Sequence, residues 1–215
     1  MICSARNGIA VALVLISSVF LAANAAAQVG LDLVGKVSRI QNAAVAMQDA
    51  IPRSLQPGSE VYLGDVISTG KGARVEIVMT DGGEVTLGEK THFVVQEFVM
   101  SNQGGNAVLR LLEGAFSVTS GKLMQTADAS LTVETNLATI GIRGTTFWGG
   151  TLDGKFEIAL LEGKGVYVET KAGRVDLDTV GEGTFVESAS KAPTPPVKWE
   201  DEKTARAVAT VTFDN

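Results

Sequence analysis

Apolar and polar residues alternate through most of this chain. Between Val34 and Val186, short runs such as Ala73–Met79 and Phe93–Val99 follow a two-residue period and end at turns rich in Gly, Asp and Asn. This is the pattern of strands that bury one face. No stretch of ten or more residues in this region repeats with the period of a helix, so the pattern predicts an all-β domain.

Two segments of this region resemble each other. Leu109–Val118 and Ile158–Val168 both contain an apolar run, a Glu-Gly pair and a second apolar run, and Val180–Val186 is a weaker copy. Glycine at the second corner position suits a residue with positive φ. Repeated strand-corner units predict a β-roll, a short β-solenoid or a two-sheet sandwich, and all three remain open.

The first residues have the pattern of an export signal. Arg6 supplies a positive charge, Ile9–Ala23 is an apolar run, and residues 25–27 are small alanines that suit cleavage. The apolar run is shorter than the roughly 20 residues of a membrane-spanning helix, and an uncleaved anchor is the alternative interpretation. We expect residues 1–27 to be removed, leaving a periplasmic or secreted protein that starts at Gln28 and does not insert into the membrane.

Composition narrows the classes of partner. The one cysteine, Cys3, lies in the predicted signal, so we expect the mature chain to lack disulfides. Loss of Arg6 changes the net charge from −6 to −7, and no cluster of Lys and Arg favours binding to nucleic acid or to an anionic membrane. About 190 residues suffice for one domain with its own core, which we expect to span residues 28–190.

The last residues, 191–215, differ in composition from the rest. Ala192–Pro196 contains three prolines, which favours an extended spacer. Trp199–Val208 has acidic residues first and basic residues later, an order that favours a short helix, with a loose tail as the alternative. Trp199 and Phe213 either anchor this tail to the β domain or offer a contact to a partner.

Candidate chemistry is sparse. His92, the only histidine, lies at a predicted strand start, and the sequence has no Gly-x-Ser-x-Gly motif that would supply the serine of a Ser-His-Asp site. One histidine without a mature cysteine cannot supply the three or four ligands of a zinc site. Glycoside hydrolysis needs two carboxylates about 5–10 Å apart in a cleft, whereas most of the candidates flank turns: Asp65, Asp81, Glu84, Glu113, Asp153, Glu162, Asp176 and Asp178. The last two are too sparse for a calcium shell, so the sequence predicts no catalytic residue, metal or cofactor.

The segment Gly-Ile-Arg-Gly-Thr at residues 141–145 interrupts a run of β-formers. Glycine reaches positive φ at low cost, so both glycines predict a bulge or tight corner between two strands. We expect Arg143 to be buried in this corner and paired with a carboxylate such as Asp65 or Glu162, with an anion or partner contact as the functional alternative. Because loss of one partner of a buried pair costs about 3–5 kcal/mol, Arg143→Ala is then expected to destabilise the fold.

The pattern around this corner resembles the signature of the FecR domain family, through Thr135, Ala138, Ile140–Thr145 and Phe147. The element at residues 64–70 and Leu87 after residues 81–83 are similar to the first half of the same family, so the likeness covers about Val34 to Val186. The family usually has Pro where this chain has Asn136, a change confined to a local turn. The resemblance implies an all-β domain, and its structural signature residues are Gly64, Asp65, Thr69, Gly70, Gly141, Arg143, Gly144 and Thr145.

The resemblance also implies an exported module that binds or senses and is not an enzyme. In the better-known members, the domain is the periplasmic part of a membrane-bound sigma-factor regulator that relays the state of an outer-membrane receptor. This chain has a predicted cleavable signal in place of the cytoplasmic anti-sigma segment. What carries over is the β domain and an envelope protein as partner, bound through sheet edges or the tail. The alternatives are a β-solenoid protein that binds or processes glycans such as surface polysaccharide, and a structural surface or adhesion protein.

Overall fold

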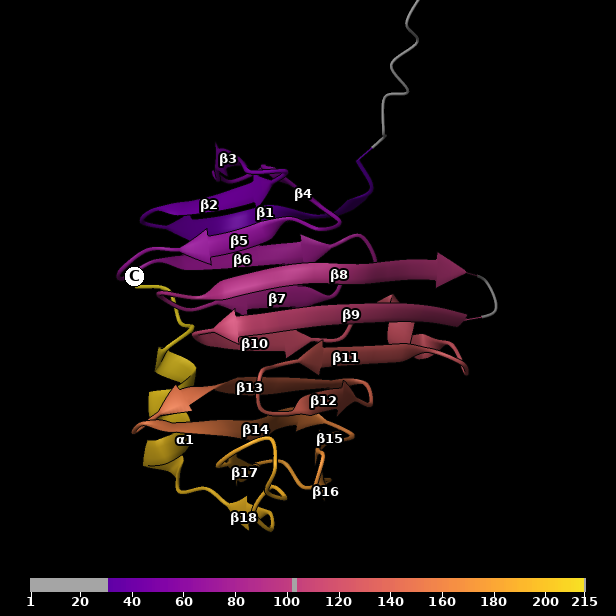
Figure 1. Ribbon diagram of the computed structural model, residues 1–215, viewed down its shortest axis with the longest axis vertical. Coiled ribbons are helices and arrows are strands. Elements are labelled where there is room, and N and C mark those ends of the chain that lie inside the picture. The colour runs from indigo at the N-terminus through magenta and orange to yellow at the C-terminus, as the bar shows by residue number, and fades with distance from the viewer. Residues whose placement is uncertain (1–30, 102–103, 215) are drawn as a thin grey trace, which may run out of the picture. The chain divides into compact units, whose positions relative to one another are not determined.

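In the computed structural model, which describes residues 31–101 and 104–214, the chain folds into two nine-stranded sheets (Figure 1). The strand order is β18-β17-β14-β13-β10-β7-β6-β1-β4 in the first sheet and β16-β15-β12-β11-β9-β8-β5-β2-β3 in the second sheet. The prediction of an all-β fold is confirmed. The predicted export signal at residues 1–27 lies outside the described residues.

The strands of the first sheet are β1 (Leu33–Gln41), β4 (Glu60–Tyr62), β6 (Arg74–Met79), β7 (Glu84–Leu87), β10 (Ala115–Thr119), β13 (Thr145–Leu152), β14 (Lys155–Gly163), β17 (Glu182–Val186) and β18 (Val197–Lys198). The strands of the second sheet are β2 (Ala44–Gln48), β3 (Ile51–Ser54), β5 (Val66–Thr69), β8 (His92–Ser101), β9 (Gly104–Glu113), β11 (Ser130–Glu134), β12 (Thr139–Ile142), β15 (Val166–Thr170) and β16 (Gly173–Leu177). A short 3-10 helix, η1 (Lys122–Gln125), precedes β11, and one α-helix, α1 (Asp201–Ala209), follows β18.

The two-residue period of the sequence places one face of each strand in a shared core. In β6, for example, every second residue is buried, and Val75 lies opposite Leu87 of β7. Inward residues of both sheets belong to one apolar cluster, in which the rings of Phe116 and Phe147 meet edge to face with centroids 5.5 Å apart. Each fully buried side chain of this size contributes roughly 1.5–3 kcal/mol, so burial of the alternating face drives the chain into facing sheets.

The predicted Glu-Gly corners are the points at which the chain changes sheet. Gly114 joins β9 of the second sheet to β10 of the first and has a φ of 102°, and Gly163 ends β14 and has a φ of 96°. A β-carbon at Gly114 would overlap Thr91, so the corner requires glycine for space as well as for conformation. The weaker copy of this pattern, Val180–Val186, differs from the two others, because its Gly183 lies inside strand β17 and not at a corner.

The tail docks on the outer side of the first sheet. Strand β18 pairs with β17, and Trp199 packs edge to face against Trp148 of β13 with centroids 6.1 Å apart. The indole N–H of Trp148 donates to Thr210 at 2.9 Å, just beyond α1. The predicted short helix is therefore present, and it covers apolar surface. Among residues 31–101 and 104–214, no helix is long and apolar enough to span a membrane.

Pro193 is buried, and the backbone N–H of Thr194 donates to the carbonyl of Phe185 in β17 at 3.0 Å. The proline-rich segment thus lies along the sheet. The described residues, 31–101 and 104–214, belong to a single compact unit, which includes this segment.

Candidate functional site

The two signature glycines have different roles. Gly144, between β12 and β13, has a φ of 71° and forms the predicted tight corner. Gly141 lies inside β12 opposite Tyr167 of β15, and any β-carbon there would overlap the tyrosine ring. The expectation that both glycines make a turn is therefore wrong for Gly141, which instead makes room for an aromatic side chain on the sheet surface.

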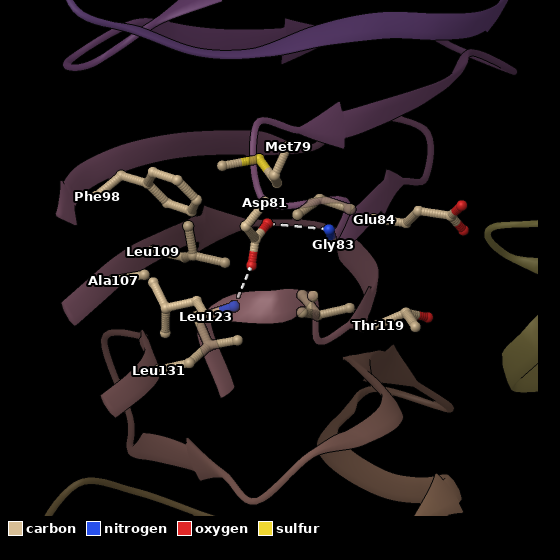
Figure 2. A pocket seen from close by; sticks show the side chains of 13 residues that line it. Met79, Asp81, Gly83, Glu84, Phe98, Ala107, Leu109, Thr119, Leu123 and Leu131 are labelled. Atoms are coloured by element: carbon tan, nitrogen blue, oxygen red, sulfur yellow. Dashed lines mark hydrogen bonds between the residues drawn. The ribbon is translucent and has the colours of Figure 1, made fainter. Parts of the chain in front are cut away.

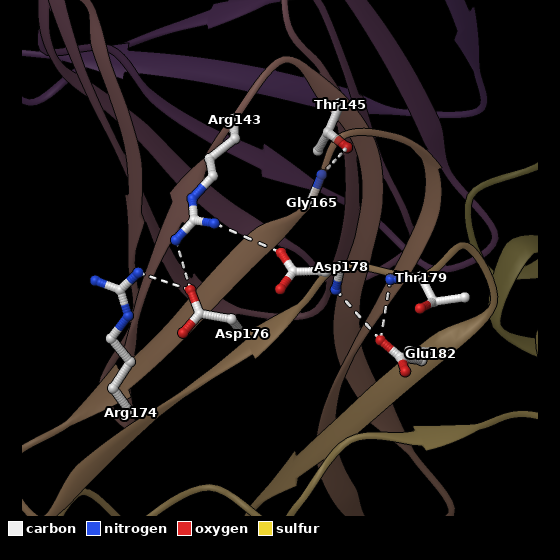
Figure 3. Close-up of polar contacts among 8 residues, drawn as sticks. All are labelled: Arg143, Thr145, Gly165, Arg174, Asp176, Asp178, Thr179 and Glu182. Atoms are coloured by element: carbon white, nitrogen blue, oxygen red, sulfur yellow. Dashed lines mark hydrogen bonds and ion pairs between the residues drawn. The ribbon is translucent and has the colours of Figure 1, made fainter.

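Thr145 ties the corner to the neighbouring strands. Its hydroxyl accepts from the N–H of Gly165 at 3.4 Å (Figure 3) and donates to the carbonyl of Glu162. Its own N–H donates to the hydroxyl of Ser120 at 2.9 Å. The side chain of Thr145 is buried. The shape of this corner thus depends on a hydroxyl that bridges two turns.

Arg143 points outward from this corner, which corrects the expectation of a buried arginine. Its guanidinium donates to Asp176 at 2.6 Å and to Asp178 at 3.5 Å, and Arg174 also donates to Asp176 at 2.7 Å (Figure 3). Neither expected partner, Asp65 or Glu162, is involved. The Arg143 side chain is 46% exposed, and exposed pairs contribute only about 0–1 kcal/mol. The predicted loss of stability in Arg143→Ala therefore shrinks to this range.

The same network sets the protonation of Asp176. The hydrogen bond from Arg174, followed by the charges of Arg174 and Arg143, lowers the pKa of Asp176, while partial burial opposes this. The hydrogen bond to Asp176 raises the pKa of Arg174, whose guanidinium also lies 3.8 Å from the centroid of the Tyr167 ring. At neutral pH these side chains form a charged, mutually paired surface.

Beside this network lies an open hollow of about 460 Å³, which we call the signature hollow. Its polar and charged lining is Thr126, Ser130, Thr132, Arg143, Lys164 and Tyr167, and its floor includes Gly141 and Ile142. Lys164 is exposed and forms no ion pair among the described residues. Two cations, several hydroxyls and one aromatic ring suit contact with a polar or acidic side chain of another molecule.

The other half of the signature is structural. Asp65 is fully buried after Gly64, which has a φ of 84°. Its Oδ2 accepts from Arg53 at 2.5 Å and from the N–H of Tyr62 at 2.8 Å, while Oδ1 has no hydrogen-bond partner among the described residues. The buried ion pair expected at Arg143 is thus found at Arg53, in the edge strand β3.

Thr69 and Gly70 are structural in the same way. The buried hydroxyl of Thr69 donates to the carbonyl of Gly88 at 2.6 Å and accepts from the N–H of Thr91 at 2.8 Å. Gly70 donates its N–H to the carbonyl of Ala43 at 2.9 Å. These bonds join turns at the ends of β5 and β7.

Asp81 also has a structural role. One carboxylate oxygen accepts from the N–H of Gly83 at 2.9 Å and the other from the N–H of Leu123 at 3.1 Å, at the start of η1 (Figure 2). The adjoining cavity holds about 20 Å³ and is lined mainly by apolar side chains such as Phe98 and Leu131. A space of this size fits about one water molecule, so it is no substrate pocket.

His92 begins β8, as predicted, and lies in a cross-strand row on the outer face of the second sheet. It is opposite Ser68 of β5 and Glu113 of β9, and its Nδ1 lies 2.8 Å from the Ser68 hydroxyl. A Ser-His site also requires a third group that orients the imidazole and donors that stabilise an oxyanion. Among the described residues, the exposed His92 ring has a hydrogen-bond partner only in the Ser68 hydroxyl, so the row does not form such a site.

The remaining acidic candidates are dispersed. Asp153 pairs with Arg206 of α1, whose hydrogen bond lowers the pKa of Asp153. Glu162, Glu84 and Glu113 lie at or near strand ends, in different places. Within residues 31–101 and 104–214, no group of three His, Cys, Asp or Glu side chains could hold a metal ion.

A second surface feature was not predicted from the sequence. Three hollows of about 350, 280 and 360 Å³ adjoin at the corner end of the sheets, because the first two share Glu113, Gly114 and Thr151, and the last two share residues 135–137. Together they form a groove of mixed polar and apolar lining, with Arg74 among its residues at one end and Lys171 at the other. Its residues come from turns far apart in the sequence, so only the fold brings them together.

Comparison with known proteins identifies the central part of the chain. The family model described as FecR protein matches residues 65–164. Two crystal structures, at 2.50 and 1.65 Å resolution, of a proposed anti-sigma factor from Parabacteroides distasonis ATCC 8503 resemble the chain with a TM-score of 0.53 and 17% identity. The likeness covers 65% of this chain and 62% of that chain, and at this identity it shows a shared fold alone. No curated protein sequence matches the chain.

Proposed function

We propose that the protein is a non-enzymatic sensing or regulatory module that binds another protein of the cell envelope, from the premise that its residues 65–164 match the FecR family model. The observation that carries the proposal is the signature hollow. Around Arg143, the residues of the family signature form an open, charged surface. Two buried residues of the signature, Asp65 and Thr145, fix the turns by hydrogen bonds to backbone groups.

The chemistry of the hollow supports a protein partner. Lys164 offers a cation that has no ion pair among the described residues, and Tyr167 offers an aromatic side chain on β15. Thr132 offers a hydroxyl on β11, on the other side of β12 from Tyr167. Arginine and tyrosine are typical of the energetically important centre of protein interfaces. A partner strand or loop with an acidic side chain suits this surface, because that side chain can form an ion pair with Lys164. Asp176 would repel a second acidic side chain placed next to it.

We propose the following organisation for the module. Residues 1–27 are a cleaved signal, residues 28–190 are the FecR-like domain built as a two-sheet sandwich, and residues 191–215 are a tail that covers Trp148. The protein is placed in the periplasm or outside the cell by this signal. The anti-sigma structural neighbours are consistent with a regulatory role for the fold.

In-cell photo-crosslinking tests the proposal. A photoreactive amino acid at Thr132, in the hollow, is compared with the same residue at Thr86, a half-buried threonine on the first sheet. We expect a discrete crosslinked product with another envelope protein from position 132 and none from position 86. Equal labelling from both positions, or no product from position 132, would contradict the proposal.

A second candidate function rests on the groove at the corner end of the sheets. Its length and its mixed lining, in which Asn136, Glu169 and Lys171 are polar and Leu137 and Phe156 are apolar, suit an extended chain such as a surface polysaccharide. Retention of the protein on envelope polysaccharide, lost in Asn136→Trp and kept in Thr132→Arg, would favour this function over the first.

A further inference from the structure

Strands β8 and β9 form a hairpin that extends past the ends of the neighbouring strands (Figure 1). Strand β8 pairs with β9 along its whole length, as far as Ser101. On its other side, β8 pairs with β5 only at residues 92–94 of β8. The N–H of Gly64 then donates to the carbonyl of Val95 at 2.9 Å. Beyond that point, the described part of the chain gives β8 a strand neighbour on one side only. We call residues 97–100 the β8 arm.

The arm has few of the features that protect a sheet edge. Natural edge strands carry lysine, proline or a bulge that discourages pairing with another strand. The arm has no lysine or proline, and its one bulge, at Gln96, lies at its base. Val99 and Met100 are 54% and 49% exposed. The unpaired side of the arm is therefore a template for one more strand.

The two faces of the arm differ. Phe98 packs against the apolar core and lines the cavity beside Leu131, so it points inward. Side chains alternate along a strand, so Met100 lies on the same face as Phe98, and Glu97 and Val99 lie on the other.

We propose that the β8 arm pairs with the β8 arm of a second copy of this chain, antiparallel and around a two-fold axis at Val99. In this register, Val99 faces the partner subunit's Val99 on the outer side. Phe98 faces the partner subunit's Met100 on the inner side, twice by symmetry. Glu97 faces the partner subunit's Ser101, so the acidic residues are not opposed. The arm is thus self-complementary in apolar pairs and in charge, as an isologous interface requires.

The interface is small. A ladder of a few residues buries less than the roughly 1,200–2,000 Å² of a stable complex. The dimer is therefore weak and reversible and forms at concentrations on the order of tens of micromolar. It does not depend on the proposed regulatory function, since the arm and the signature hollow are separate groups of residues.

Sedimentation velocity of the purified full chain, from about 5 to about 500 µM, tests the proposal. Val99→Lys is compared with Val180→Lys, because Val180 is a valine of similar exposure, 50%, outside the arm. We expect a concentration-dependent dimer that Val99→Lys weakens at least about tenfold, the effect of losing roughly 1.4 kcal/mol, while Val180→Lys leaves it unchanged. Urea midpoints within error of the parent show that both variants are folded.

A second readout fixes the register. In a Cys3→Ser background, Val99→Cys is expected to form an intermolecular disulfide and Val180→Cys is not, since only the first places two cysteines across the axis. A monomer at all concentrations, or an equal effect of the two lysine variants, would overturn the proposal. A dimer that Val99→Cys fails to crosslink would overturn the Val99 register.

Discussion

Replacing Arg53 with methionine is expected to destabilise the fold by about 3–5 kcal/mol, because it leaves a carboxylate alone in the interior. Asp65 is 0% exposed and has two hydrogen-bond donors, Arg53 at 2.5 Å and the N–H of Tyr62 at 2.8 Å. Loss of Arg53 removes the only cation that pairs with this carboxylate among the described residues. Methionine keeps most of the apolar stem, so the change isolates the charge.

Removing the charge of Asp65 in place of that of Arg53 is expected to cost less stability. The Arg53 side chain is 33% exposed, so water can solvate its guanidinium once the carboxylate is gone. In Asp65→Asn, the amide oxygen still accepts from the N–H of Tyr62, and the loss is that of one charge-assisted hydrogen bond, about 1.5–3 kcal/mol. The double variant Arg53→Met with Asp65→Asn removes both charges and keeps an acceptor for the N–H of Tyr62, so it is expected to recover most of the stability.

Urea unfolding followed by tryptophan fluorescence measures these differences, since Trp148 and Trp199 are buried. For a chain of this length, about 3–5 kcal/mol corresponds to a fall in Tm of roughly 10 °C. Arg143→Ala is the control, because its ion pair is exposed and worth at most about 1 kcal/mol. A smaller loss of stability in Arg53→Met than in Arg143→Ala, or a double variant less stable than Arg53→Met, would show that Arg53 does not stabilise a buried Asp65 carboxylate.

Three further changes test other parts of the structure. Gly141→Ala should destabilise the fold by about 1–3 kcal/mol in urea unfolding, because a methyl group would overlap the Tyr167 ring. Adding Tyr167→Ala to the same chain should reverse most of this loss, and a lack of rescue would show that the clash is not its cause. Trp199→Ala should cost about 3–5 kcal/mol, as for other buried tryptophans, with a calorimetric Tm as the measure, and an unchanged Tm would mean that the tail does not dock. The pKa of Asp176 is lowered in the folded state, so its contribution to folding stability should be complete above the ordinary aspartate pKa of about 3.9 and lost as pH falls below that value. Urea midpoints between about pH 3 and pH 6 should therefore vary slightly less in Asp176→Asn than in the parent. An identical pH profile in the two proteins would contradict the network.

Local features of the fold could be predicted from the sequence, because their causes are local. The two-residue period requires strands with one buried face, and the Glu-Gly pairs at Gly114 and Gly163 require positive φ. The short helix follows from the order of charges at its ends. Each of these predictions depends on residues within one element or one turn.

The partners of charged side chains could not be predicted, because they depend on strand order. Arg143 meets Asp176 only because β15 lies between β12 and β16, and nothing near either residue encodes that order. Likewise, Asp65 meets Arg53 across the turn that joins the two sheets. Glycine on both sides of Arg143 suggested an enclosed corner, whereas Gly141 makes room for an aromatic ring from another strand.

The tail was ambiguous for a related reason. An aromatic residue in a polar segment, such as Trp199, serves equally well to dock the segment or to bind a partner. The structure resolves this in favour of docking, because Trp199 is buried against Trp148 and lies over Gly183 of β17, where a β-carbon would overlap its ring.

Blocking the signature hollow tests most directly whether the FecR signature builds a binding surface for a protein. Once crosslinking from Thr132 has identified the partner, its affinity for the purified chain should be measured by calorimetry with Thr132→Arg, which fills the signature hollow, and with Thr86→Arg as the control. The account predicts at least about tenfold weaker binding for Thr132→Arg, or roughly 1.4 kcal/mol, with unchanged binding for Thr86→Arg. Full affinity in Thr132→Arg would contradict it.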